Sequence, residues 1–162
     1  TIRLCLGGET RRESVARGVS ALSREVDLVL IHDAARPLAT ADLMCEGLRF
    51  ASSSGAAIAA IPVRDTIKEV APDGVIERTP DRVRLYAAQT PQVFRRDWLE
   101  ESYRKLHVAG AELAFSDEAG LLEWAGYRVS IFPGSPENIK LTYPIDLLVA
   151  DAILRSRRGI DQ

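Results

Sequence analysis

In the first part of the chain, continuous apolar runs alternate with segments in which apolar residues recur at helical spacing. The apolar runs Leu28–Ile31 and Ala56–Ile61 have the length and composition of buried strands, and residues 2–6 are interpreted as another strand. Apolar residues at helical spacing predict helices over Arg11–Leu22 and, behind a Thr40 cap, over 41–52. Strand and helix therefore alternate, which is typical of a parallel sheet with helices on both faces.

The pattern changes after the second strand. Thr66–Val70 and Val75–Thr79 are short and polar, and the turn Ala71-Pro72-Asp73-Gly74 between them predicts a β-hairpin. A third extended piece is expected over Arg84–Ala88. Strands this polar do not suit a central sheet, so we expect residues 63–90 to form an arm that projects from the body. Its exposed edges need a cover, and we expect a second copy of the chain to provide it in a homodimer.

The alternating pattern resumes after the arm. It predicts helices over 95–106, 117–125 and 144–157, a strand over 128–132 and a short extended piece at Asn138-Ile139-Lys140. We therefore predict a single α/β domain over the 162 residues. Its Rossmann-like sheet carries helices on both faces, and the β-hairpin arm projects from it.

Composition narrows the classes of partner. The chain is 46% hydrophobic and 27% charged, with a net charge of −2. This balance provides no general attraction to nucleic acid or to an anionic membrane, and no apolar run approaches the length of a membrane span. Cys5 and Cys45 lack metal-ligand spacing and are interpreted as core thiols of a cytoplasmic protein. Any bound phosphate must therefore be held by a local cluster of charge.

Candidate chemistry lies where the first buried strand ends, at His32-Asp33-Ala34-Ala35-Arg36-Pro37. Ligands of open α/β sheets bind beyond the carboxyl ends of the strands. The guanidinium of Arg36 suits a phosphate, and the two alanines let a ligand approach the backbone. The alternative is an ordinary turn, in which Asp33 caps nearby N–H groups and Arg36 is a solvated charge.

Three further positions are candidates for phosphate or polyol binding. Lys140 precedes a predicted helix, whose N-terminus attracts anions, although a solvated lysine is the simpler reading. Arg82 either pairs with Asp81 or reaches a phosphate across a dimer interface. Thr90-Pro91-Gln92 is interpreted as a rigid turn whose hydroxyl and amide can bond a polyol, or as ordinary turn chemistry.

Several short motifs occur in a characteristic order along nearly the whole chain. They are Gly-Gly-Glu-x-Arg-x-Glu-Ser-Val at 7–15, His-Asp-Ala-Ala-Arg-Pro at 32–37, Pro-Val-Arg-Asp-Thr at 62–66, Asp81-Arg82, Gln89-Thr90-Pro91-Gln92, Asp117-Glu118-Ala119 and Asn138-Ile139-Lys140. Each motif is weak by itself, but the ordered set is specific. With this ordered set of motifs, the chain resembles the family of 2-C-methyl-D-erythritol 4-phosphate cytidylyltransferases.

The resemblance implies a cytoplasmic, homodimeric nucleotidyltransferase of non-mevalonate isoprenoid synthesis. Such enzymes transfer a cytidylyl group from CTP to methylerythritol phosphate with Mg²⁺ and release diphosphate. Carried over by position, the residues expected to line the cytidine site are Gly8, Glu9, Ser14 and Ala34. Those expected around methylerythritol phosphate are Arg36, Thr66 and Thr90, together with the catalytic candidates Asp33, Arg82 and Lys140. Interlocked arms would let each site draw residues from both subunits, and the metal ligands stay unassigned.

The chain departs from the family pattern in two places. Glu9 stands where some members have Asp, which lengthens the side chain by a methylene. The family's Gly-rich loop with Arg and Lys, which cradles the triphosphate, belongs before Gly7-Gly8. We therefore expect an N-terminally incomplete domain, with little or no transferase activity from these residues alone. Two alternatives are a cytidylyltransferase for another polyol phosphate, such as ribitol 5-phosphate, and a non-catalytic dimerisation remnant.

Overall fold

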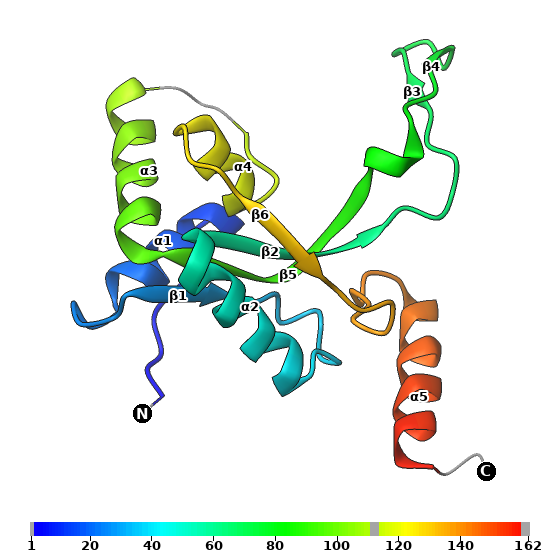
Figure 1. Ribbon diagram of the computed structural model, residues 1–162, viewed down its shortest axis with the longest axis horizontal. Helices are drawn as coiled ribbons and strands as arrows, with labels where there is room; N and C mark the ends of the chain where they lie inside the picture. Colours follow the sequence, from blue (N-terminus) through cyan, green and yellow to red (C-terminus); the bar gives the residue numbers. More distant parts are fainter. Residues whose placement is uncertain (1, 111–113, 160–162) are drawn as a thin grey trace.

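A four-stranded sheet forms the centre of the computed structural model, which describes residues 2–110 and 114–159. The strands run in the order β1 (Leu28–Ile31), β5 (Tyr86–Arg95), β2 (Ala56–Pro62) and β6 (Ser130–Pro133), as Figure 1 shows. β2 and β6 are parallel, whereas β5 is antiparallel to both of its neighbours. The sheet is therefore mixed.

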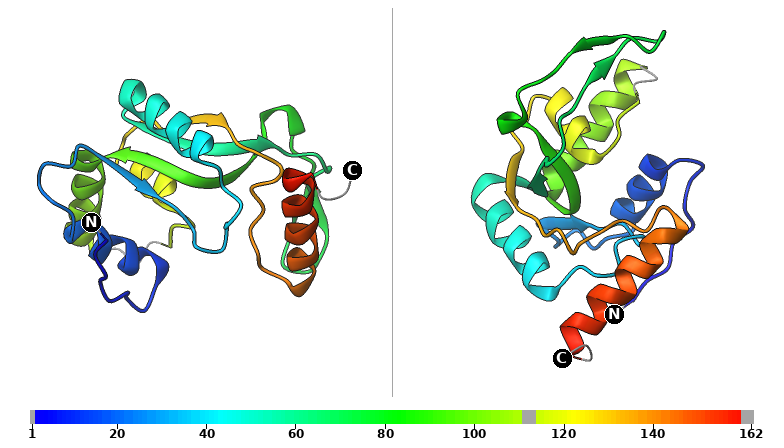
Figure 2. Two further views of the ribbon diagram at one scale, coloured as in Figure 1. Left: turned by 90° about the horizontal axis from the view of Figure 1, so that it is seen from below. Right: turned by 90° about the vertical axis from the view of Figure 1, so that its right-hand side faces the viewer.

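Helices cover both faces of this sheet, as predicted. The described α-helices are α1 (Arg11–Ser20), α2 (Ala41–Ser54), α3 (Arg96–Ala109), α4 (Glu118–Trp124) and α5 (Pro144–Arg158), of which α5 does not cover the sheet. Viewed along the sheet in Figure 2, α2 lies on one side and α1 on the other. α5 stands apart from the sheet, beyond the loop that follows β6, and Figure 1 shows it at the same end of the molecule as the arm.

Two apolar clusters match the alternation of side chains along the strands. Ala57 and Ala59 of β2 pack with Phe132 of β6 under α2. The neighbouring Ile58 points to the opposite face, where it joins a cluster with Leu99 of α3. The strand segment at 56–60 is almost wholly buried on both faces, which explains why its sequence is continuously apolar.

The prediction of a parallel sheet is wrong for β5. The chain leaves the sheet at the end of β2, runs through the arm and returns beside the same strand, so that Pro62 pairs with Tyr86. A connection that leaves and returns at neighbouring positions makes its two strands antiparallel. The arm is thus an elaborated hairpin between adjacent strands of the sheet.

The turn predicted at Thr90-Pro91-Gln92 is wrong, because the ten-residue strand β5 runs through it. The extended piece predicted at Arg84–Ala88 is the start of the same strand from Tyr86 on, whereas Arg84 belongs to a 3₁₀ turn. Proline is rare in central strands, since it cannot donate a ladder hydrogen bond. Here the register against β2 is irregular: Ile58 pairs with Gln92 but Ala60 pairs with Ala88. Pro91 lies inside this irregular stretch, where no regular ladder bond is required of it.

The arm projects from the sheet as predicted (Figure 1). Its tip is a two-stranded sheet of β3 (Glu69–Val70) and β4 (Ile76–Arg78), shorter than the predicted strands, and a 3₁₀ turn at Arg82–Arg84 leads into β5. Several apolar side chains of the arm are exposed. They are Ile67, Val70, Val75, Ile76, Val83 and Tyr86.

Two further expectations fail. Residues 2–6 form no strand: Leu4 is 97% exposed, and a strand needs a neighbour for its hydrogen bonds. Cys5 and Cys45 are exposed free thiols rather than core residues. No helix in the described part of the chain combines the length and the apolar character that crossing a membrane requires.

Candidate functional site

A groove of about 420 Å³ opens at the carboxyl end of β1. Its walls come from α1, from the turn after β1 and from the loop that leads to α5. The lining residues are Arg11, Ser14, Val15, Ile31, His32, Asp33, Ala34, Ala35 and Lys140. Four of the residues singled out in the sequence, Ser14, Asp33, Ala34 and Lys140, therefore meet in one groove.

The carboxylate of Asp33 lies between two cations. Its Oδ1 is 3.3 Å from Nε of Arg11, and its Oδ2 is 3.2 Å from Nζ of Lys140. Partial burial raises the pKa of Asp33, but the hydrogen bond and charge of Lys140, followed by those of Arg11, outweigh it and leave the pKa below its ordinary value. Asp33 is therefore an ionised acceptor rather than a proton donor.

Arg11 also contacts a second carboxylate, on the side away from the groove. Its Nη1 donates to Oε2 of Glu118 at 2.6 Å, and Glu118 is only 2% exposed. Burial lowers the pKa of Arg11, but the hydrogen bond and charge of Glu118, with a smaller contribution from Asp33, raise it above its ordinary value. Charges thus alternate in sign along Glu118, Arg11, Asp33 and Lys140.

A hydrogen-bonded network holds the turn that carries Asp33. The hydroxyl of Thr90 accepts from the backbone N–H of Asp33 at 3.1 Å and lies 2.9 Å from Nδ1 of His32. Nε2 of His32 is 3.0 Å from the carbonyl of Arg36, which can only accept. We therefore assign the proton to Nε2, so that Nδ1 accepts from the Thr90 hydroxyl. Thr90 thus contacts the backbone of the site rather than lying free in the groove.

Arg36 lies behind the groove and ties two loops together. Its Nη1 donates to the carbonyl of Asn138 at 2.6 Å, and its Nη2 reaches the carbonyl of Ala88 at 3.5 Å. Asn138 is 1% exposed and donates in turn to the carbonyl of Thr90 at 2.7 Å. Burial lowers the pKa of Arg36, with the charge of Asp33 opposing this effect. These contacts set the path of the loop that delivers Lys140.

Gly8 and Glu9 precede α1 and contact its first turn. The N–H of Gly8 donates to Oγ of Ser14 at 3.0 Å, and the N–H of Glu9 donates to a carboxylate oxygen of Glu13 at 2.8 Å. A Cβ atom on Gly8 would lie 2.2 Å from Cβ of Glu13, so this approach requires glycine. The segment lies one contact away from the groove, through Ser14.

Thr66 and Arg82 lie on the arm, and none of their interactions within the described part of the chain reaches the groove. Thr66 is exposed, and Nη1 of Arg82 donates to the carbonyl of Arg64 at 2.9 Å. The pairing of Arg82 with Asp81 that the sequence left open is not formed here. Asp81 instead caps the 3₁₀ turn by accepting from the N–H of Val83.

Sequence reasoning assigned no role to Arg11 or to Glu118. Both residues belong to motifs of the ordered set, but they are 107 positions apart in the chain. Their pairing is a tertiary contact with no local pattern. The only signal in the sequence was that the two motifs contain charged residues, Arg11 and Glu118, to which no role had been assigned.

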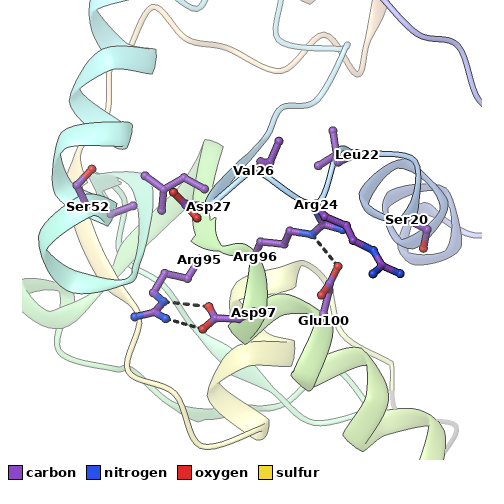
Figure 3. Close-up of a pocket in the computed structure, with 12 residues that line it drawn as sticks. Ser20, Leu22, Arg24, Val26, Asp27, Ser52, Arg95, Arg96, Asp97 and Glu100 are labelled. Atoms are coloured by element: carbon purple, nitrogen blue, oxygen red, sulfur yellow. Dashed lines mark hydrogen bonds and ion pairs between the residues drawn. The ribbon is translucent and has the colours of Figure 1, made fainter.

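A larger groove, of about 1000 Å³, lies at the start of β1 (Figure 3). Two of its arginines already have carboxylate partners: Nε of Arg95 is 2.9 Å from Asp97, and Nε of Arg96 is 2.7 Å from Glu100. The residues that line this groove include none of the site candidates singled out in the sequence, whereas the groove at Asp33 brings four of them together. The groove at Asp33 is therefore the better candidate for a functional site.

The described residues contain no cluster of three or more His, Cys, Asp or Glu side chains that could hold a metal ion. Among the described residues that line the groove, Asp33 is the only carboxylate, and each of its oxygens faces a cation. A Mg²⁺ ion prefers unpaired oxygen ligands in octahedral geometry. The groove as built therefore does not provide a protein site for Mg²⁺.

Open α/β sheets bind their ligands beyond the carboxyl ends of their strands, which is where this groove and its lysine lie. The family profile of 2-C-methyl-D-erythritol 4-phosphate cytidylyltransferases (IspD) matches residues 1–156. The chain belongs to this family, which confirms the resemblance seen in its motifs.

Relatives of known sequence and structure agree with this assignment. The 2-C-methyl-D-erythritol 4-phosphate cytidylyltransferase of Dehalococcoides mccartyi (strain CBDB1) is 45% identical over 97% of this chain and 66% of its own length. The crystal structure of the enzyme of that name from Thermus thermophilus superposes with a TM-score of 0.81 at 38% identity, covering 92% of this chain and 71% of the other.

A second structural relative extends the comparison. The 4-diphosphocytidyl-2C-methyl-D-erythritolsynthase of Anaerococcus prevotii has a TM-score of 0.86 at 32% identity, covering 94% of this chain and 70% of the other. The predicted nucleotidyltransferase fold is thereby confirmed. The chain spans about two thirds of the length of these relatives.

Proposed function

We propose that this chain provides the polyol-phosphate side of a cytidylyltransferase site, which transfers the cytidylyl group of CTP to 2-C-methyl-D-erythritol 4-phosphate and releases diphosphate. One observation carries the proposal: Lys140 and Asp33 contact each other in an open groove at the end of β1. Family membership and the names of the relatives support the choice of substrates. The transfer would serve the synthesis of isoprenoid precursors by the non-mevalonate route.

The chemistry requires two anions to meet, because the phosphate of the acceptor attacks the α-phosphorus of CTP. Little covalent help is needed in such a transfer, and positioning with charge compensation supplies most of the catalysis. Lys140 offers the attacking phosphate a cation whose side chain is 49% exposed and therefore accessible. Asp33 keeps lone pairs beyond its two ion pairs, and these can accept from hydroxyl groups of the polyol. We assign Asp33 to orienting the substrate, with Arg36 and Thr90 holding the loop and the turn around it.

The nucleotide side is proposed for the opposite wall of the groove. Ala34 and Ser14 line it, and the backbone of Gly8 and Glu9 is tied to α1 beside Ser14. The small side chains of Ser14 and Ala34 suit the close approach of a pyrimidine nucleoside. Mg²⁺ is proposed to arrive bound to the triphosphate of CTP, as part of the substrate, because Asp33 is already paired with two cations.

A homodimer is proposed to complete the site. Arg82 and Thr66 belong to the arm, which projects from the sheet (Figure 1), and none of their interactions within the described part of the chain reaches the groove. An arm with exposed apolar residues such as Val83, which is 81% exposed, needs a partner surface. A second copy that covers the arm would bring Arg82 to the phosphate bound at Lys140. We place this enzyme in the cytoplasm, with CTP, a polyol phosphate and a second copy as its partners.

Calorimetric titration with methylerythritol phosphate tests the function, because acceptor binding does not depend on the triphosphate side of the site. We expect binding that Lys140→Met weakens by at least about tenfold, since the variant loses a charge-assisted contact. The control Lys105→Met, on α3, removes a cation that does not line the groove and leaves binding unchanged. Absence of heat with methylerythritol phosphate would contradict the proposal.

Two further titrations separate the alternatives. Tighter binding of ribitol 5-phosphate than of methylerythritol phosphate would favour the sister enzyme. Heat on addition of CTP with Mg²⁺ argues against a remnant that has lost its nucleotide site.

Analytical ultracentrifugation tests the dimer: we expect Val83→Lys to shift the chain towards monomer, whereas Val108→Lys, at an exposed position of α3, leaves it dimeric.

A further inference from the structure

Glu118 is the buried carboxylate in the series of alternating charges Glu118, Arg11, Asp33 and Lys140, and it does not line the groove. Glu118 is the first residue of α4 and is 2% exposed, so it cannot reach a ligand or bulk water. Its Oε2 accepts from Arg11 at 2.6 Å, and its Oε1 lies 3.4 Å from the hydroxyl of Tyr103. A buried carboxylate is energetically costly unless it is paired, so the role of Glu118 is expected to involve its partner, Arg11.

Arg11 divides its guanidinium between two carboxylates from distant parts of the chain. Nη1 faces Glu118, and Nε faces Asp33. The side chain of Arg11 is 36% exposed, and its contact with Asp33 is the longer one, at 3.3 Å. A half-exposed pair at that distance is too weak to hold an arginine in one conformation. The short contact to a dehydrated carboxylate is a far stronger constraint.

Glu118 is itself well anchored. Asp117 caps α4 by accepting from the N–H of Gly120 at 3.0 Å, and it also accepts from Nε2 of Gln92 at 2.7 Å. Gln92 belongs to β5, two residues after Thr90, which holds the turn of Asp33. The start of α4 is thus fixed to the same strand that fixes the turn. The position of Glu118 relative to Asp33 is set by the core.

We propose that Glu118 is a positioning residue for the phosphate site: it holds Arg11 so that Nε stays on Asp33, which in turn keeps the Asp33 carboxylate oriented beside Lys140. The functional half of this inference rests on the proposed function. Arginine is required at position 11, because its planar fork spans two carboxylates, whereas the single ammonium of a lysine cannot. Glu118 acts through Arg11 and Asp33 and touches no substrate.

NMR of the arginine side chains tests the positioning without any ligand. The Nε–Hε signal of Arg11, assigned by its loss in Arg11→Lys, should show a high heteronuclear NOE in the parent chain. In Glu118→Gln, which keeps the size of the side chain but removes its charge, we expect that NOE to fall to the level of an exposed arginine such as Arg24. The control Glu46→Gln, which removes a surface pair with Arg49 on α2, leaves the Arg11 signal unchanged. An Arg11 that stays equally ordered in Glu118→Gln would overturn the proposal.

A double-mutant cycle on the affinity for methylerythritol phosphate tests the functional half. We expect Glu118→Gln to weaken binding by about tenfold in the parent chain and by less than about twofold in an Asp33→Asn background, because its effect passes through Asp33. Equal losses in both backgrounds would indicate a merely structural role and overturn the proposal, as would no loss in the parent chain.

The two experiments distinguish a failure of the proposed function from a failure of the positioning role of Glu118. If the parent chain does not bind methylerythritol phosphate, the proposed function has failed, and the Arg11 signal alone decides the positioning. If Glu118→Gln does not fold, Arg11→Lys replaces it, since Arg11 is partly exposed and lysine preserves the charge. Arg11→Lys is expected to weaken binding to the same degree, and unchanged binding would overturn the proposal.

Discussion

Replacing Thr90 by valine removes one hydroxyl from the network behind the groove. Valine has nearly the same shape, so the packing of this 4% exposed side chain is preserved. The substitution takes away the acceptor for the N–H of Asp33, at 3.1 Å, and the donor to Nδ1 of His32, at 2.9 Å. Both groups lie in a partly buried turn with no other partner for those atoms among the contacts of the described chain.

The size of the effect follows from those two contacts. A buried polar group left without its partner costs about 1–3 kcal/mol, and partial access to water places each of these near the lower end. We therefore expect Thr90→Val to lower the free energy of unfolding by about 2 kcal/mol. For a domain of this size that corresponds to a fall in melting temperature of about 4–8 °C.

Thermal and urea unfolding followed by circular dichroism measure this loss. Thr79→Val is the matched control: its hydroxyl accepts from Lys68 on the exposed arm at 2.7 Å, and its removal should change stability by less than about 0.5 kcal/mol. If Thr90→Val were as stable as the parent chain, the network would not hold the turn, and the reasoning about Asp33 would be refuted.

Further predictions concern acid stability and the glycines. The pKa of Asp33 lies below its ordinary value of 3.8 in the folded chain, so its ion pairs stabilise the fold above about pH 4 and are lost as the pH falls through the folded pKa. Asp33→Asn should therefore flatten the fall of the urea midpoint below about pH 4, and an unchanged pH profile would exclude this contribution. Gly55→Ala should destabilise more than Gly74→Ala: both glycines have positive φ, but a Cβ at Gly55 would lie 2.3 Å from the Trp98 ring, whereas Gly74 has nothing within 4 Å. Equal losses of urea midpoint in these two variants would contradict the packing at Trp98.

The sequence was most informative where local pattern and burial coincide. The strand at Leu28–Ile31 has the predicted bounds, and the strand from Ala56 is only one residue longer than predicted. These segments are apolar on both faces, and no tertiary detail is needed to recognise them. β5 was broken into pieces because Pro91 signals a turn locally, whereas the irregular register against β2 that accommodates it depends on a partner strand.

In the candidate site, too, some features could be predicted from the sequence and others depend on tertiary contacts. The sequence offered Asp33 and Lys140 as separate candidates, and only the family resemblance implied that they share one site; the structure brings them within 3.2 Å of each other. The ion pair of Arg11 with Glu118 could not be predicted, since nothing in either segment specifies a partner 107 residues away. Arg82 and Thr66 lie on the arm, and their roles stay predictions.

Amide chemical-shift mapping during a titration with methylerythritol phosphate tests the central claim most directly. We expect the largest shifts at Ala34, Ala35 and Lys140, which line the groove at the end of β1. We expect no saturable shifts at Arg24 and Asp27, which line the larger groove at the start of that strand (Figure 3). Saturable shifts confined to the larger groove, with none around Lys140, would contradict the account.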